Sequence, residues 1–263
     1  MDVKEVLKKY NLEPKKYRDQ IFIADEDLQR EVVDLAELDR EDHVLEIGAG
    51  LGNLTKYIAE ICPVTAVEKD GRMAAVIRHL DMENISVLHR DIMSTHLGNL
   101  NFNKIVSNLP YSVSTPLTFK LLKMDWNLAV LIYQKEFAHR MVSKPGTTEN
   151  SRMALKVQYY CDAEIVKEIP SNMFYPEPLT DSAIVRLRRK DVEEKSTGFW
   201  KIVKAAFHHK RKKVKNSLKD SAQFLGIEKD DIKDLEKKLP DKRVYECSIE
   251  DFEEIEALLE QVM

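Results

Sequence analysis

The chain of 263 residues is 43% hydrophobic and 33% charged, which is typical of a water-soluble protein, and its length suits one large domain plus a small one. Its apolar runs are far shorter than the roughly 20 residues of a membrane span, and its charged N-terminus lacks the apolar core of a signal peptide, which argues against a membrane or secreted protein. The net charge of −4 does not indicate a nucleic-acid-binding protein, although a sum over the whole chain can conceal a local basic patch.

Between residues 42 and 190, short apolar runs alternate with helical patterns. Runs this short and rich in Val, Ile and Leu predict buried strands. Their alternation with helices implies a parallel sheet with helices on both faces. Two later runs, 164–169 and 183–187, are expected to close the sheet as an antiparallel pair. The other predicted strands are 43–47, 64–67, 85–88, 104–107 and 128–133, and the predicted helices include 53–61, 72–80 and 115–123.

The composition changes near residue 190. Segment 190–197 is charged and poor in apolar residues, as a linker would be. The pattern after it is helical to the end of the chain, and segment 199–207 places its apolar residues on one helical face. We therefore predict a cofactor-binding catalytic domain over residues 1–190 and a small all-α domain over residues 191–263.

The strongest local signal is a buried strand that runs into three glycines, Gly48, Gly50 and Gly52, and then into a helix. Glycines let the backbone approach a ligand and adopt positive φ, and the helix N-terminus offers unpaired N–H groups. In a nicotinamide-binding loop the third glycine comes one residue later and the loop holds a pyrophosphate. The spacing found here, with Glu46 just before the loop, resembles the S-adenosylmethionine loop, which holds a methionine tail.

Two acidic residues follow the glycine loop at the ends of the next two predicted strands. Glu68 ends the second strand, where a carboxylate can accept both ribose hydroxyls of an adenosine. Asp91 follows the third strand, where it can accept from an adenine amino group. Each alone is usually a solvated side chain. Together with the glycines they mark the crevice at the carboxyl ends of the strands, so we expect S-adenosylmethionine as the cofactor.

The fourth strand ends in Asn108-Leu109-Pro110-Tyr111, which resembles the signature of amino methyltransferases that act on adenine. An adenine amino nitrogen is a poor nucleophile because its lone pair is delocalised into the ring. Acceptance of its hydrogens by the Asn108 side-chain oxygen and the Leu109 carbonyl would pull it toward tetrahedral geometry. Pro110 fixes the turn, and Tyr111 offers an aromatic face to a base that has left its stack. No strong general base is required, because in-line positioning carries most of the catalysis.

Nearly the whole chain, residues 17–262, resembles the small-subunit ribosomal RNA adenine dimethyltransferases (the kasugamycin-sensitivity and Dim-type family), and we expect an archaeal member. Segment 174–183 is similar to the family's Phe-x-Pro-x-Pro-x-x-Asp-Ser-Ala loop. The resemblance implies that Phe174 is the partner of Tyr111 in sandwiching the flipped adenine. It also implies a Rossmann-like class I methyltransferase fold, with a mainly parallel seven-stranded sheet.

An N-terminal motif departs from the family pattern. Gln20, Ile21, Phe22 and Ile23 stand where the family has Gln-Asn-Phe-Leu or Gln-His-Phe-Leu. Because Ile21 has no polar side chain, the usual side-chain hydrogen bond to the cofactor is in doubt. We expect Gln20 and the backbone of Ile21 and Ile23 to line the cofactor pocket.

A dense basic cluster marks the C-terminal domain. Segment 201–215 has seven basic residues and no acidic one, and 207–218 resembles the family's Phe-x-x-Arg-Arg-Lys-x-x-x-Asn-x-Leu helix, with Lys210 in place of the first Arg. Such a cluster repels itself unless phosphates neutralise it, so we interpret it as an RNA contact rather than a solvated helix face. The expected RNA-binding residues are Lys210, Arg211, Lys212, Lys213 and Lys215.

The cysteines and histidines do not predict a metal site. Cys62, Cys161 and Cys247 are far apart and lack metal-type spacing, which favours a reducing cytoplasm. His208 and His209 are adjacent, so their side chains point to different helix faces.

The resemblance implies dimethylation of two adjacent adenosines near the 3′ end of small-subunit ribosomal RNA, within a pre-ribosomal small subunit, by a monomeric enzyme. The nearest alternative is a large-subunit methyltransferase of the antibiotic-resistance type, but the basic helix and the Phe-x-Pro-x-Pro loop favour the small subunit. A largely non-catalytic assembly factor is less favoured because Asn108, Tyr111 and Phe174 are intact. A DNA adenine methyltransferase is also less favoured, because such an enzyme usually has Asp in place of Asn108 and a larger recognition domain.

Overall fold

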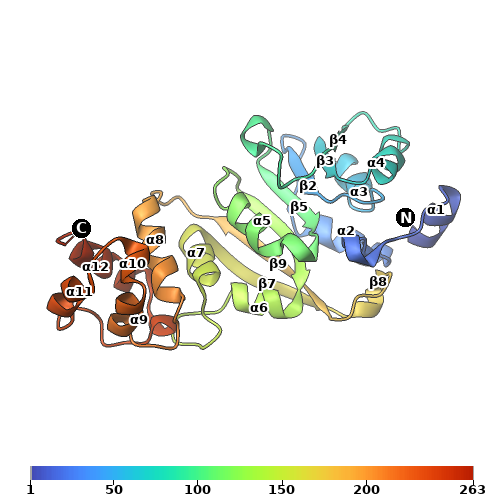
Figure 1. Ribbon diagram of the computed structural model, residues 1–263. Helices are drawn as coiled ribbons and strands as arrows, with labels where there is room; N and C mark the ends of the chain where they lie inside the picture. Colours follow the sequence, from blue (N-terminus) through green and yellow to red (C-terminus); the bar gives the residue numbers. More distant parts are fainter. Residues whose placement is uncertain (1, 263) are drawn as a thin grey trace. The chain divides into compact units, whose positions relative to one another are not determined.

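The predicted strands form one seven-stranded sheet in the computed structural model, which describes residues 2–262 (Figure 1). Its order is β4-β3-β2-β5-β6-β9-β7, and the neighbours from β4 to β6 are parallel. Strand β9 runs antiparallel to β6, and β7 forms the edge beside it, so the expected Rossmann-like architecture is confirmed. The strands are β2 (Val44–Ile47), β3 (Val64–Glu68), β4 (Ile85–His89), β5 (Lys104–Asn108), β6 (Leu128–Gln134), β7 (Cys161–Ile169) and β9 (Ser182–Arg189).

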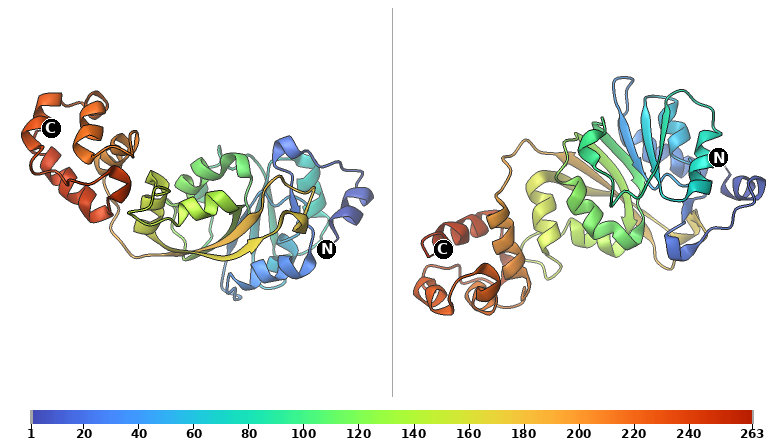
Figure 2. Two further views of the ribbon diagram at one scale, coloured as in Figure 1. Left: turned by 90° about the horizontal axis from the view of Figure 1, so that it is seen from below. Right: turned by 45° about the horizontal axis from the view of Figure 1, so that its top comes forward.

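The apolar runs become central strands because both faces of the sheet are covered. Strands β2 and β6 are buried along almost their whole length, as expected for strands inside a parallel sheet. Right-handed crossovers place α3 and α4 on one face and α5 on the other (Figure 2). The helices of this part of the chain are α1 (Val3–Lys9), α2 (Glu26–Asp34), α3 (Thr55–Ala59), α4 (Gly71–Arg78), α5 (Ser114–Leu121), α6 (Lys135–Met141) and α7 (Arg152–Tyr160).

Strand order reverses between β2 and β5, since β3 and β4 lie on one side of this pair and β6 lies on the other. Loops that leave the two strands at their carboxyl ends diverge there and open a crevice. The reversal therefore brings the glycine loop after β2 and the Asn108 turn after β5 to the same edge of the sheet.

A second, two-stranded sheet had no counterpart in the sequence prediction. Strand β1 (Phe22–Ile23) pairs antiparallel with β8 (Phe174–Tyr175), so Ile23 lies opposite Phe174. Both strands have only two residues, too few for a visible alternation of apolar and polar side chains. The pairing joins the N-terminal motif to the Phe-x-Pro-x-Pro loop.

The chain divides into two units that differ from the expected domains. The α/β unit contains residues up to Ala138 together with Asp162–Arg189, and the helical unit contains His139–Cys161 together with the chain from Lys190 onward. Segment 139–161 was expected in the first domain but groups with the C-terminal helices, because Leu155 of α7 belongs to their hydrophobic core. The functional division at residue 190 stays a prediction.

The helical unit has one hydrophobic core, to which the predicted face of segment 199–207 contributes Phe199, Ile202, Val203 and Ala206. Among residues 2–262, no helix is long and apolar enough to cross a membrane. The remaining helices are α8 (Thr197–Phe207), α9 (Val214–Asp220), α10 (Ala222–Leu225), α11 (Lys229–Leu235) and α12 (Ile249–Leu259), and the short 3-10 helices of the whole chain are η1 (Lys16–Arg18), η2 (Leu97–Asn99), η3 (Tyr111–Val113), η4 (Ser171–Met173) and η5 (Val244–Glu246).

The basic segment is not one continuous helix, contrary to the expectation from the family motif. Helix α8 ends at Phe207 and α9 begins at Val214, and residues 208–213 form turns between them. This stretch has no apolar side chain to bury, and like charges one helical turn apart destabilise a helix. A bridge between Lys213 and Arg243 fixes the end of this basic turn, by which we mean residues 208–213.

We predict that Phe252→Ala lowers the free energy of unfolding of the helical unit by about 3–5 kcal/mol, because it leaves a cavity where the buried ring stacks on Phe207. Phe224→Ala is the matched control. Since the Phe224 ring is 39% exposed, its removal should cost less than about 1 kcal/mol. Urea denaturation followed by circular dichroism measures both, and equal losses would contradict the assigned core.

Candidate active site

A cavity of about 480 Å³ lies in the α/β unit at the carboxyl ends of β2, β3 and β5. Its walls also include the N-terminal motif, which precedes the sheet in the chain. Most residues expected to bind the cofactor line this one cavity. Those residues are Gln20, Ile21, Ile23, Glu46, Gly48, Gly50, Glu68, Asp91 and Asn108, and Pro110 of the expected catalytic set joins them.

The glycine loop has positive φ at all three glycines, with +58° at Gly50. A Cβ at Gly50 would stand 2.8 Å from the ring of Phe22, so only glycine lets the N-terminal motif approach the loop this closely. Gly52 plays a different part from the one expected. It does not line the cavity, and a Cβ there would stand 2.9 Å from Leu80, so the third glycine serves packing against the residues after α4.

Two buried carboxyl groups stand beside the loop. The pKa of Glu46 is raised to about 8, mainly by burial and in part by the charge of Glu68. A 2.5 Å hydrogen bond from the Thr55 hydroxyl acts in the opposite direction and lowers this pKa. Burial also raises the pKa of Glu68, although its two oxygens accept from the N–H groups of Gly50 (2.8 Å) and Asp70 (2.7 Å). Each carboxylate oxygen has a second lone pair, so these bonds leave Glu68 able to accept from a ligand. A pocket with two such groups suits a cationic ligand with hydroxyls.

Asp91 lies on a loop to which two lysines donate hydrogen bonds. Its carboxylate accepts from Lys69 Nζ (2.6 Å) and from the N–H of Met93 (2.9 Å), and the bond from Lys69 holds the pKa of Asp91 below its usual range. Lys120 of α5 donates to three carbonyls of this loop, those of Ile92, Met93 and Thr95, at 2.6, 3.0 and 2.6 Å. Sequence analysis missed Lys120, since a single lysine in an ordinary helix carries no distinguishing signal.

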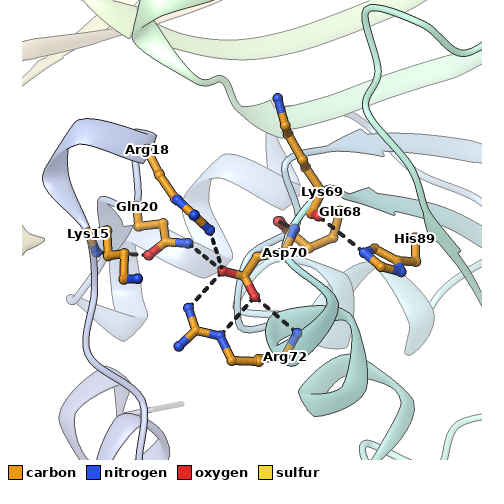
Figure 3. A network of polar contacts seen from close by, with 8 residues as sticks. All are labelled: Lys15, Arg18, Gln20, Glu68, Lys69, Asp70, Arg72 and His89. Atoms are coloured by element: carbon orange, nitrogen blue, oxygen red, sulfur yellow. Dashed lines mark hydrogen bonds and ion pairs between the residues drawn. The ribbon is translucent and has the colours of Figure 1, made fainter.

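Asp70 was also missed, although it is the centre of a polar network beside the cavity (Figure 3). Gln20 donates to its carboxylate at 3.1 Å, Arg18 lies 3.5 Å away, and Arg72 donates from its side chain and backbone. The hydrogen bonds from Arg72 come first among the causes that hold the pKa of Asp70 far below its usual range. Gln20 therefore uses its side chain to hold the N-terminal segment, because its oxygen also accepts from the N–H of Lys15 at 2.8 Å.

Asn108 ends β5, and its side-chain amide has a hydrogen bond at the nitrogen but none at the oxygen. Its Nδ2 donates to the carbonyl of Ile21 at 2.8 Å. Its Oδ1 is buried and has no hydrogen-bond partner among the residues that the structure describes. A buried acceptor without a donor costs free energy, so this atom is expected where a ligand supplies the donor. The sequence predicted such a donor, the amino group of a substrate adenine.

Of the other residues of the Asn108 turn, Pro110 lines the cavity, whereas Leu109 and Tyr111 do not. Pro110 lines the cavity and approaches the glycine loop, since its Cγ lies 3.3 Å from the position of a Cβ on Gly48. Leu109 is buried, and only Pro110 of these two is part of the cavity wall. Tyr111 lies outside the wall as well. Its hydroxyl is 2.7 Å from that of Ser182, and burial raises its pKa to about 12.

Phe174 does not stand open beside Tyr111. It is 3% exposed and packs in the hydrophobic core. In the two-stranded sheet it lies opposite Ile23, a residue of the same core. The structure brings neither ring to the cavity wall. The expected sandwich of a flipped adenine between the two rings therefore stays a prediction.

Two lysines of the basic turn, and Lys215 after it, pair with acidic side chains, so part of the expected self-repulsion is relieved within the protein. Burial lowers the pKa of Lys210, which donates to the carbonyls of Thr148 and Asn150 at 2.7 and 3.1 Å. Among residues 2–262, the side chain of Arg211 has no ion-pair partner. The other three lysines pair as Lys212–Asp220 (2.6 Å), Lys213–Asp241 (2.7 Å) and Lys215–Glu236 (2.7 Å).

These ion pairs lie at the surface, where a pair contributes only about 0–1 kcal/mol and exchanges its partner easily. Phosphates can therefore replace the carboxylates. Across the described part of the chain, no group of three or more His, Cys, Asp and Glu side chains has the arrangement of a metal site.

Comparison with known proteins agrees with this geometry. A model of the ribosomal RNA adenine dimethylase family matches residues 11–261. A protein of Thermococcus sibiricus named "Probable ribosomal RNA small subunit methyltransferase A" is 40% identical over 97% of this chain and 95% of its own. A relative of the same name from Methanothermobacter thermautotrophicus is 37% identical, with 99% and 96% covered.

Solved structures give the same result. A dimethyladenosine transferase from Plasmodium falciparum is 26% identical and superposes with a TM-score of 0.79, over 91% of this chain and 96% of its own. The 23S rRNA methyltransferase ErmE shares the fold, with a TM-score of 0.67, 23% identity and coverage of 91% and 100%. The chain therefore belongs to the ribosomal RNA adenine dimethylase family, whose members are S-adenosylmethionine-dependent methyltransferases.

Proposed function

We propose that this enzyme dimethylates the exocyclic amino groups of two adjacent adenosines near the 3′ end of small-subunit ribosomal RNA. The observation that carries the proposal is the unpartnered buried Oδ1 of Asn108 beside the cavity. An amino group is the donor that this acceptor lacks. The name of the curated relatives, a small-subunit methyltransferase, supports the choice of subunit.

The residues of the cavity fit S-adenosylmethionine. The cofactor supplies a methyl group on a positively charged sulfur, which makes the methyl carbon electrophilic. We propose that Glu46 and Glu68 bind its cationic and hydroxyl-bearing parts, that Gly48 and Gly50 allow its close approach, and that Asp91 accepts from its adenine. The raised pKa values of both glutamates support this assignment, because a bound cation compensates for the burial of their negative charge.

Asn108 holds the reacting nitrogen by accepting one of its hydrogens, which favours tetrahedral geometry at that nitrogen. The proton leaves only after the new N–C bond has made the amino group acidic. We assign it to water. The carboxylates that line the cavity, each of which also accepts hydrogen bonds from this chain, are Asp19, Glu46, Glu68, Asp70 and Asp91.

We further propose that the enzyme acts as a monomer in the cytoplasm, on small-subunit RNA within a pre-ribosomal particle. The basic turn together with Lys215 supports an RNA contact, since its surface ion pairs exchange easily for phosphate. The large-subunit alternative draws support from the 23S rRNA methyltransferase ErmE, but that similarity shows the fold alone. A non-catalytic assembly factor would have no use for the unpartnered oxygen of Asn108.

We predict that Asn108→Ala lowers kcat for methyl transfer about 10²- to 10³-fold, as expected when one positioned hydrogen bond to the reacting group is lost. Labelled S-adenosylmethionine and small subunits from a dimethylation-deficient strain, followed by nucleoside analysis, measure this directly. Asn101→Ala, at an exposed position of the same unit, is the control and should keep the wild-type rate. Label in large-subunit RNA would instead favour the resistance-type enzyme, and no label in any RNA would favour the assembly factor.

We predict that Glu46→Gln flattens the pH dependence of stability. Burial holds the folded-state pKa of Glu46 at about 8, above the roughly 4.3 of an unfolded chain, so between these values the folded state binds more protons. The stability contribution of this proton is complete below pH 4 and is lost as pH rises through about 8. Denaturation at pH 5 and pH 9 should show a smaller decline in Glu46→Gln than in wild type. Glu60→Gln, at an exposed site, should decline like wild type.

We predict that Arg211→Ala weakens RNA binding and reduces the slope of log K against log salt by about one, because one phosphate contact is lost. Lys237→Ala, at an exposed position of the helical unit outside the basic turn, should leave the slope unchanged. Filter binding of small-subunit RNA over a range of salt concentrations measures both. Equal slopes for the two variants would remove the basic turn from the RNA contact.

A further inference from the structure

Three consecutive residues of the N-terminal segment bond to two loops around the cavity, the loop after β3 and the turn after β5. We call residues 15–23 the strap. Asp19 accepts from both the N–H (3.2 Å) and the hydroxyl of Ser112. Gln20 donates to Asp70 at 3.1 Å, as Figure 3 shows. The carbonyl of the next residue, Ile21, accepts from Asn108 Nδ2 at 2.8 Å.

The bond to Ile21 determines which way the Asn108 amide points. With the amide turned over, its oxygen would face the carbonyl oxygen of Ile21, and two acceptors would meet without a proton between them. Because the strap presents a carbonyl, the Asn108 nitrogen faces the strap and Oδ1 is the atom without a partner. The backbone makes this contact, so it does not depend on the side chain at position 21. That explains why an apolar Ile21, packed against the hydrophobic core, is compatible with the site.

Asp19 is the second attachment of the strap to the chain segment that carries Asn108. Its partner Ser112 lies four residues after Asn108 in one segment. In the strap, Ile21 lies two residues after Asp19. The two contacts therefore join the same two segments side by side. Asp19 has φ +56°, in the left-handed region that Asp tolerates better than most residues, so the strap turns sharply between the two contacts.

We infer that Asp19 is a positioning residue for methyl transfer: by holding the strap against Ser112 it keeps the Ile21 carbonyl on Asn108 Nδ2 and so keeps Asn108 Oδ1 for the substrate amino group. The inference rests on the catalytic role proposed for Asn108. Asp19 lines the cavity, but its carboxylate accepts from Ser112 and not from Asn108. Its inferred effect on the reaction is therefore transmitted through the strap and the amide of Asn108.

A double-mutant cycle tests this transmission, with kcat for methyl transfer to small subunits as the readout. In the wild-type background, Asp19→Ala should lower kcat by about tenfold or more, and Asp19→Asn, which keeps an acceptor for Ser112, should restore most of it. In the Asn108→Ala background, the same Asp19→Ala change should alter kcat less than about twofold, because the group it positions is gone.

Asp81→Ala is the matched control for backbone strain. Asp81 has φ +51° and is exposed, so alanine there meets the same left-handed backbone without touching the strap. This variant should keep the wild-type kcat, and the thermal midpoints of Asp19→Ala and Asp81→Ala should agree within a few degrees.

Three results would overturn the inference. Losses in kcat that multiply in the double variant would mean that Asp19 acts independently of Asn108, and an unchanged kcat in Asp19→Ala would mean that it does not act at all. Both leave the proposed function intact. Full activity of Asn108→Ala would remove the catalytic role of Asn108 and the positioning role of Asp19 together.

Discussion

The reversal of strand order between β2 and β5 is the constraint on which the site depends. Parallel strands end at the same edge of a sheet, and loops that diverge from two neighbouring strands leave space between them. The glycine loop after β2 and the Asn108 turn after β5 meet in that space, where Pro110 leaves no free room for a side chain at position 48. Neither loop alone encloses a ligand. The sheet supplies the position, and the N-terminal strap supplies the missing wall.

The enclosed site has a clear electrostatic character. Both acidic and basic side chains line it, and two of the carboxyl groups, Glu46 and Glu68, are buried enough for their pKa values to rise. A positively charged cofactor relieves that burial, whereas a dinucleotide pyrophosphate would add negative charge to it. The departure from nicotinamide-type glycine spacing and the charge of the pocket thus lead to the same cofactor by independent arguments.

Sequence patterns predicted the parts of the structure that have local signals. Five parallel strands agree with the prediction to within a residue or two at each end, because short runs such as 128–133 have no periodicity compatible with a surface helix. Most cofactor-site residues, which lie directly after strands, line one cavity. The residues that sequence missed are Asp19, Asp70 and Lys120. Each acts on a partner 25 or more residues away, and their identities are ordinary for exposed turns and helices.

Two predictions failed or stayed open for the same physical reason. The basic segment was assigned to a helix from its motif, but stretch 208–213 has no apolar face to anchor a helix and forms turns. Phe174 was assigned to the substrate from its motif, but its ring is packed in the core. A motif records which residue types recur together. It does not record which side chain is buried in the state without substrate.

The pairing of Lys212 and Lys213 of the basic turn with Asp220 and Asp241, and of Lys215 with Glu236, has a consequence for the selectivity of the proposed RNA contact. These carboxylates act as built-in counterions, so an arriving phosphate gains little unless it displaces them. A random RNA that touches one or two of these lysines meets a nearly neutral surface, because each lysine is paired with a carboxylate. Only a strand whose phosphates match several lysines at once replaces the whole set. In the proposed RNA contact, the acidic partners would thus disfavour RNA whose phosphates do not match the lysines.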